Sequence, residues 1–209
     1  MVILACLVLV AAVAYSMAVE GIAEALIVLF ITLIAGFFAL ASHQPMANFL
    51  AGKFAGSMAE GTEDALALVG IFCLTAGGLR WLTQIILPWQ VTLPPLANQV
   101  GGALLGAISG WLAGGILSLA FATLPWQHDS WGMESPVAAD QTPTAFRTIF
   151  PSDLVWLAGA RRMSANSRFG HGAAFDEDGS YLIRFGRHRT GWSNSKPQTF
   201  AGEPYSGQP

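Results

Sequence analysis

One uncharged apolar stretch, residues 101–124, constrains the fold of this chain more than any other feature. It reads GGALLGAISGWLAGGILSLAFATL and is 24 residues long. An apolar run of about 20 residues is long enough to cross a bilayer core of about 30 Å as a helix. The stretch therefore predicts a membrane-spanning helix and an integral membrane protein.

Glycines recur at every fourth position of this stretch. They are Gly102, Gly106, Gly110 and Gly114. Residues four apart share one face of a helix, and a face without side chains lets another helix backbone approach closely. The spacing predicts a glycine zipper, and tight packing against a neighbouring helix of the same chain is the favoured interpretation. Self-association of several copies, or the lining of a pore, is the alternative.

Charge is distributed unevenly along the 209 residues. Only 11% of the residues are charged, whereas soluble domains carry about 25%. Up to Pro125 the chain has two basic and five acidic residues, and the remainder has eight of each. We therefore expect a transmembrane domain over residues 1–127 and a polar tail over 128–209. The net charge of −3, without a basic stripe, excludes nucleic acid as a partner.

The apolar half predicts further spans. Residues 2–42 form a nearly continuous apolar run, interrupted only by Glu20, Gly21 and Glu24. Because this run is twice as long as one span and charges are costly at mid-bilayer, we expect two helices that turn at Glu20–Gly21. The fold class is an all-α membrane protein with four transmembrane helices in two hairpins. The predicted helices cover residues 2–19, 22–42, 65–87 and 95–124.

Two segments of this half have less direct interpretations. A cleaved signal peptide is the alternative for the first run, because residues 12–14 resemble a cleavage site. Such peptides begin with a positively charged segment, which this run lacks, so we expect it to remain as a span. Residues 43–64 are polar enough for a loop. Within it, the apolar spacing over residues 46–58 predicts an interfacial amphipathic helix.

The polar tail carries weaker patterns. Ser152 is a suitable N-cap before an apolar segment that ends in two arginines, so we expect a short helix near 152–163. A turn followed by a strand-like segment predicts a hairpin or strand near 173–187. The Gly-, Ser- and Pro-rich end from residue 191 onwards is typical of disorder.

No residues have the spacing of a catalytic, cofactor or metal site. The four histidines are scattered without partners at ligand spacing, so no zinc site is expected. Ser109 lies in a predicted span, but no predicted span contains a histidine to activate it. Asp176 and Asp178 have the spacing of a calcium loop, yet Tyr181 occupies the position of the required glycine. We expect neither enzymatic activity nor a cofactor.

Arg80 is the one ionisable residue inside a predicted span and away from a turn. With four spans, it lies on the same side as Glu20 and Glu24. We expect its guanidinium to bind one of these carboxylates, because a bidentate carboxylate partner stabilises an arginine near the interface. Otherwise it turns to the headgroups beside Trp81 and Trp89. Structural anchoring is the first interpretation of this intramembrane charge, and conduction is the alternative.

The order of these features resembles the colicin V production (CvpA) family, a group of small bacterial inner-membrane proteins with four predicted spans. The segment from Glu20 to Glu24 is similar to that family's Gly-x-x-Glu after the first span. Residues 96–110 are similar to its Asp-Arg-x-x-Gly-x-x-x-Gly entry into the last span, with Asn98-Gln99 where the family often has a charged pair. The resemblance covers residues 1–125.

The resemblance implies a non-enzymatic inner-membrane protein that supports colicin V production or export and envelope homeostasis. The lipid bilayer is its expected partner, together with further copies of the chain or other envelope proteins. By the positive-inside tendency, we expect both termini in the cytoplasm. The alternative is a small channel or transporter subunit, whose path would be lined by Arg80, Gln84, Asn98 and Gln99. A third hypothesis is a membrane anchor whose function lies in the tail.

Overall fold

The computed structural model describes residues 2–54, 62–86, 94–124 and 151–165. Its helices are α1 (Val2–Glu20), α2 (Ile22–Phe54), α3 (Glu63–Ile86), α4 (Pro95–Thr123) and α6 (Ser152–Ala165). No strand occurs in these ranges, so the described protein is all-helical, as predicted. The hairpin or strand predicted near 173–187 and the predicted disordered end lie outside the described residues.

Three of the helices, α2, α3 and α4, are long and apolar enough to cross a membrane. Helix α1 is also apolar, but its apolar part is shorter. These helices indicate a multi-pass membrane protein, while a fourth span in α1 stays a prediction. The helices begin and end close to the predicted bounds, except at the end of α2.

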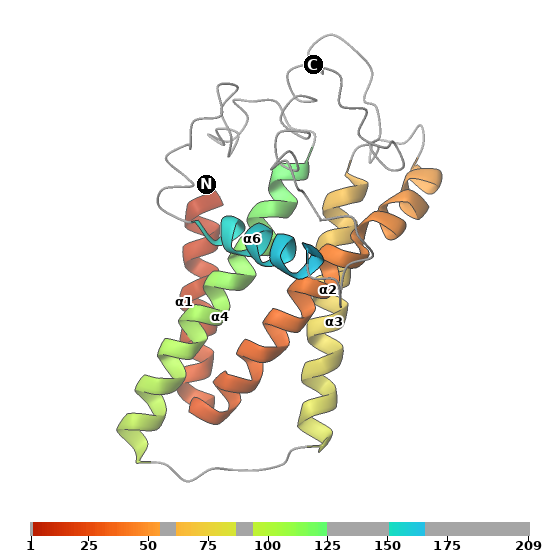
Figure 1. Cartoon of the computed structure of the whole chain (residues 1–209). Helices are drawn as coiled ribbons and strands as arrows, with labels where there is room; N and C mark the ends of the chain where they lie inside the picture. The colour runs from red at the N-terminus through yellow and green to blue at the C-terminus, as the bar shows by residue number, and fades with distance from the viewer. Residues whose placement is uncertain (1, 55–61, 87–93, 125–150, 166–209) are drawn as a thin grey trace.

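A single residue, Gly21, separates α1 from α2. Its φ of +102° lies in the left-handed region, where glycine is favoured because it has no Cβ to clash. The Gly21 amide still donates to the carbonyl of Met17 at 2.8 Å, which completes the last turn of α1. The chain reverses direction here, as Figure 1 shows, and the predicted break at Glu20–Gly21 is confirmed.

The predicted loop over residues 43–64 is wrong in its first half, because α2 continues to Phe54. His43 is buried, and its Nδ1 donates to the carbonyl of Leu40 at 2.9 Å, so the helix itself satisfies this ring nitrogen. The helix also passes through Pro45, which removes one backbone hydrogen bond. The first part of the predicted interfacial helix is therefore the last turns of α2, and its remainder lies outside the described residues.

Helices that follow one another in the sequence are not always the closest neighbours in space. Helix α1 packs along α4, α2 packs along α3, and α2 also contacts α4. Figure 1 shows α1 and α4 side by side and antiparallel, while α2 leans away from them after the turn at Gly21. The expected first hairpin is therefore corrected: its two helices diverge, because α1 packs on the last long apolar helix.

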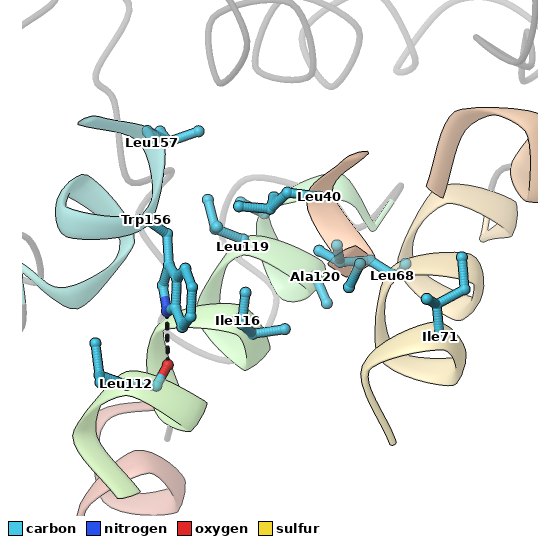
Figure 2. Close-up of a cluster of buried hydrophobic side chains, with 12 residues drawn as sticks. Leu40, Leu68, Ile71, Leu112, Ile116, Leu119, Ala120, Trp156 and Leu157 are labelled. Carbon is cyan, nitrogen blue, oxygen red and sulfur yellow. Dashed lines mark hydrogen bonds between the residues drawn. The ribbon is translucent and has the colours of Figure 1, made fainter. Parts of the chain in front are cut away.

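The core lies where α2, α3 and α4 meet and where α6 crosses α4 and α2 (Figures 1 and 2). Its buried members include Leu40, Leu68, Leu112, Ile116, Leu119, Trp156 and Leu157. Helix α6 belongs to the segment that the sequence assigns to a polar tail, yet it packs on α4 and α2. The boundary at residue 127 therefore does not separate α6 from the bundle.

Large apolar side chains cover the outside of the long helices. On α4 they recur at every fourth position, opposite the glycines, and are Leu96, Val100, Leu104 and Ile108. On α2 the same spacing exposes Leu26, Phe30, Ile34 and Phe38. Such stripes are unfavourable in water, and a lipid environment accounts for them.

Candidate functional site

One arginine and two glutamates from three different helices meet where α1 turns into α2. Arg80 of α3 donates from Nη2 to Glu20 of α1 and from Nη1 to Glu24 of α2, the latter at 2.5 Å. From the sequence we expect Arg80 to bind one of the two carboxylates, and in the structure its guanidinium binds both. The cluster carries a net charge of −1 and ties α3 to the turn between α1 and α2.

Asn98 links the start of α4 to the same turn. Its Oδ1 accepts a hydrogen bond from the backbone amide of Ile22 at 2.9 Å, which satisfies one of the N–H groups left open at the start of α2. The side chain of Asn98 also fills the space beside Gly21, where a Cβ would stand 2.7 Å from Oδ1. From the sequence, Asn98 is a candidate for lining a transport path, whereas in the structure it caps the start of α2.

The glycine face of α4 lies against α1. A Cβ on Gly106 would stand 2.7 Å from the Cβ of Met17, and a Cβ on Gly110 would stand 2.8 Å from the Cα of Val10. Real Cβ atoms do not approach other atoms so closely. The two helices pack at a distance that only glycine permits at these positions.

The two ends of the glycine face are also in contact with α1. A Cβ on Gly102 would collide with the carbonyl oxygen of Met17. The carbonyl of Gly114 accepts a weak hydrogen bond from the Cys6 thiol, with an S to O distance of 3.8 Å. All four predicted glycines are buried, so they lie within the bundle and not on its surface.

The glycines of α3 provide a contrast. A Cβ on Gly70, Gly77 or Gly78 would meet no atom within 4 Å. Glycine content alone therefore does not identify a packed face. What distinguishes α4 is the regular spacing of four residues, because it places Gly102, Gly106, Gly110 and Gly114 on one side of the helix.

Trp156 of α6 occupies a second site, which the sequence analysis missed. Its indole Nε1 donates to the carbonyl of Leu112 in α4 at 2.8 Å, the dashed line in Figure 2. The ring meets Phe37 of α2 edge to face, with ring centroids 5.1 Å apart. Gly36 and Gly115 form the walls of the slot: a Cβ on Gly36 would collide with the indole, and one on Gly115 would stand 2.8 Å from Cδ1. We call this the tryptophan slot.

No periodic pattern in the sequence predicts the tryptophan slot. Gly36 and Gly115 lie outside the repeat of four residues that drew attention to the last span. Trp156 is one of three tryptophans in the polar tail, and no periodic pattern around it assigns it to the core. Only the crossing of α6 over α2 and α4 brings these residues together (Figure 1).

No family model, no curated protein and no solved structure matches this chain. Across the helices that the structure describes, no group of three or more His, Cys, Asp or Glu side chains could hold a metal ion. The two cysteines are both free thiols: Cys6 is buried and Cys73 is exposed. The resemblance to the CvpA family stays a prediction.

Proposed function

We propose that this chain is a non-enzymatic, multi-pass protein of a bacterial inner membrane. In this proposal both termini face the cytoplasm, and the protein supports toxin production or export and envelope homeostasis, as the resemblance to CvpA proteins implies. The observation that supports the proposal is that Arg80 is paired with two carboxylates. Both terminal nitrogens of its guanidinium bind carboxylates, so this intramembrane charge serves to join three helices.

The other polar residues that could line a transport path also favour a closed bundle over a pore. Asn98 is engaged as the cap of α2. Gln84 and Gln99 lie on exposed positions of α3 and α4, away from the buried core. The glycine face of α4 is filled by α1, so oligomerisation through that face would require α1 to leave it. A pore built on this face is therefore disfavoured relative to a closed structural bundle.

The proposal is tested by complementation. The chain is expressed in a bacterium that carries the colicin V genes but lacks its own CvpA-type gene, and secreted colicin is measured by inhibition of a sensitive lawn. We expect the full-length chain to restore secretion. A G106L variant, which cannot keep the contact between α1 and α4, is the matched control and should restore less. Failure of the stably inserted chain to restore secretion would overturn the proposal.

The alternative of a channel or transporter subunit has a separate test. A pore formed between copies requires several chains in one particle, whereas a closed bundle does not. The molar mass of the detergent-solubilised protein, corrected for bound detergent, distinguishes the two. A multimeric mass together with ion flux into reconstituted vesicles would favour the channel and contradict the closed bundle.

A further inference from the structure

Helix α6 has apolar residues on two opposite faces. One face carries Trp156 and Leu157, which are buried against α2 and α4. The other face begins with Leu154 and Val155, which are 42% and 47% exposed. A helix that is apolar on both sides is stable only where both sides meet apolar surroundings. The bundle provides such surroundings on one side, and the exposed side needs a second apolar partner.

The position of α6 along the bundle suggests what this partner is. Helix α6 contacts α4 at the level of Gly115, where a Cβ would stand 2.9 Å from the carbonyl oxygen of Ser152. From Pro95, the first residue of α4, to this level the helix rises by roughly 30 Å, which is about the thickness of the hydrocarbon core. The exposed apolar stripe of α4, Leu96 to Ile108, lies within this interval. Exposed Leu4 and Leu7 of α1 lie near the same level, because Cys6 between them bonds to the carbonyl of Gly114. Helix α6 thus crosses the bundle near one edge of its apolar outer band.

The crosswise orientation of α6 and its exposed arginine are consistent with a position near the membrane interface. Figure 1 shows α6 lying across α4 and α2 instead of running along them. Arg162 is exposed and lies two helical turns after Val155, on the same outward side. An arginine on this side is complementary to the phosphate groups of lipids, which it binds through paired hydrogen bonds.

We propose that α6 is an in-plane membrane helix whose outward face contacts lipid. Leu154 and Val155 lie at the boundary between acyl chains and headgroups, and Arg162 binds lipid phosphate there. The tryptophan slot holds the opposite face of the helix on the bundle. Helix α6 therefore lies close to one edge of the hydrocarbon core. This interaction surface does not depend on a role in toxin export.

The test measures the depth of α6 in a bilayer by electron paramagnetic resonance. In a full-length C6A and C73S background, single spin labels are attached through L154C or V155C. The protein is reconstituted into vesicles of phosphatidylcholine and phosphatidylglycerol in equal amounts. Collision with oxygen, which concentrates in lipid, is compared with collision with a water-soluble nickel complex. We expect an oxygen-to-nickel ratio several-fold higher than that of a free spin label in buffer.

Labels at I34C and L104C, on exposed apolar positions of α2 and α4, provide the reference for lipid contact. A ratio at residues 154 and 155 equal to that of the free label would overturn the proposal. Protection from both reagents would also overturn it, because protein and not lipid would then cover the face. The R162Q variant should lower the ratio at residue 155 in these vesicles, and no change would contradict binding of phosphate by Arg162.

Discussion

Arg80 balances two carboxylates from different helices, so its replacement has a defined effect. The R80Q variant leaves Glu20 and Glu24 close together without a cation. We expect a loss of about 1–2 kcal/mol in the free energy of unfolding, at the lower end for such bonds because all three side chains are partly exposed. Thermal unfolding in detergent measures this loss. Combining R80Q with E20Q and E24Q should recover part of it, and equal stability of R80Q and the parent would contradict the assigned role.

Two glycine positions provide a matched pair for testing the glycine face. In G106L the new side chain must enter space held by Met17 and Val13, so we expect a loss of about 1–3 kcal/mol by overpacking. In G77L the side chain enters open space, and leucine has a better helix propensity than glycine. We therefore expect G77L to unfold at the same temperature as the parent or slightly higher. Equal losses in both variants would contradict close packing of α4 on α1.

At the scale of the helices, the tryptophan slot governs whether α6 stays on the bundle. The W156A variant removes the indole and its hydrogen bond to Leu112, and we expect it to destabilise the docked helix by about 3–5 kcal/mol. Hydrogen exchange of α6 amides is the direct measurement, because an undocked helix loses protection. The M163A variant changes an exposed residue of the same helix and should leave exchange unchanged. Unchanged protection in W156A would show that other contacts hold α6.

The sequence predicted where the helices lie along the chain better than it predicted which helices pack together. The length of the apolar runs and the glycine at residue 21 were sufficient to place four helices and one turn, because these are local properties. The end of α2 was missed because residues 43–64 are polar enough for a loop, although Nδ1 of His43 bonds to the carbonyl of Leu40 within the helix. The docking of Trp156 was missed because it depends on how α6 crosses α2 and α4, which no local pattern encodes.

For the whole molecule, the order of the helices predicts a topology. Figure 1 places the start of α1, the start of α3 and the end of α4 at one end of the bundle, and the turn between α1 and α2 at the other. If α1 to α4 all span, a reporter inserted after residue 58 reports the same side as the N-terminus. A reporter after residue 90 reports the opposite side. Phosphatase and fluorescent-protein fusions at these two points measure this, and the same side for both would contradict four spans.

The pairing of α1 with α4 has a consequence for biosynthesis. The Cys6 thiol bonds to the carbonyl of a residue 108 positions later in the chain. At about 5–20 residues per second, a ribosome needs roughly 5–20 s to extend the chain from the end of α1 to the end of α4. During this interval α1 remains in the nascent chain without its partner, while α2 and then α3 are synthesised. We therefore expect the contact between α2 and α3 to form before the contact between α1 and α4.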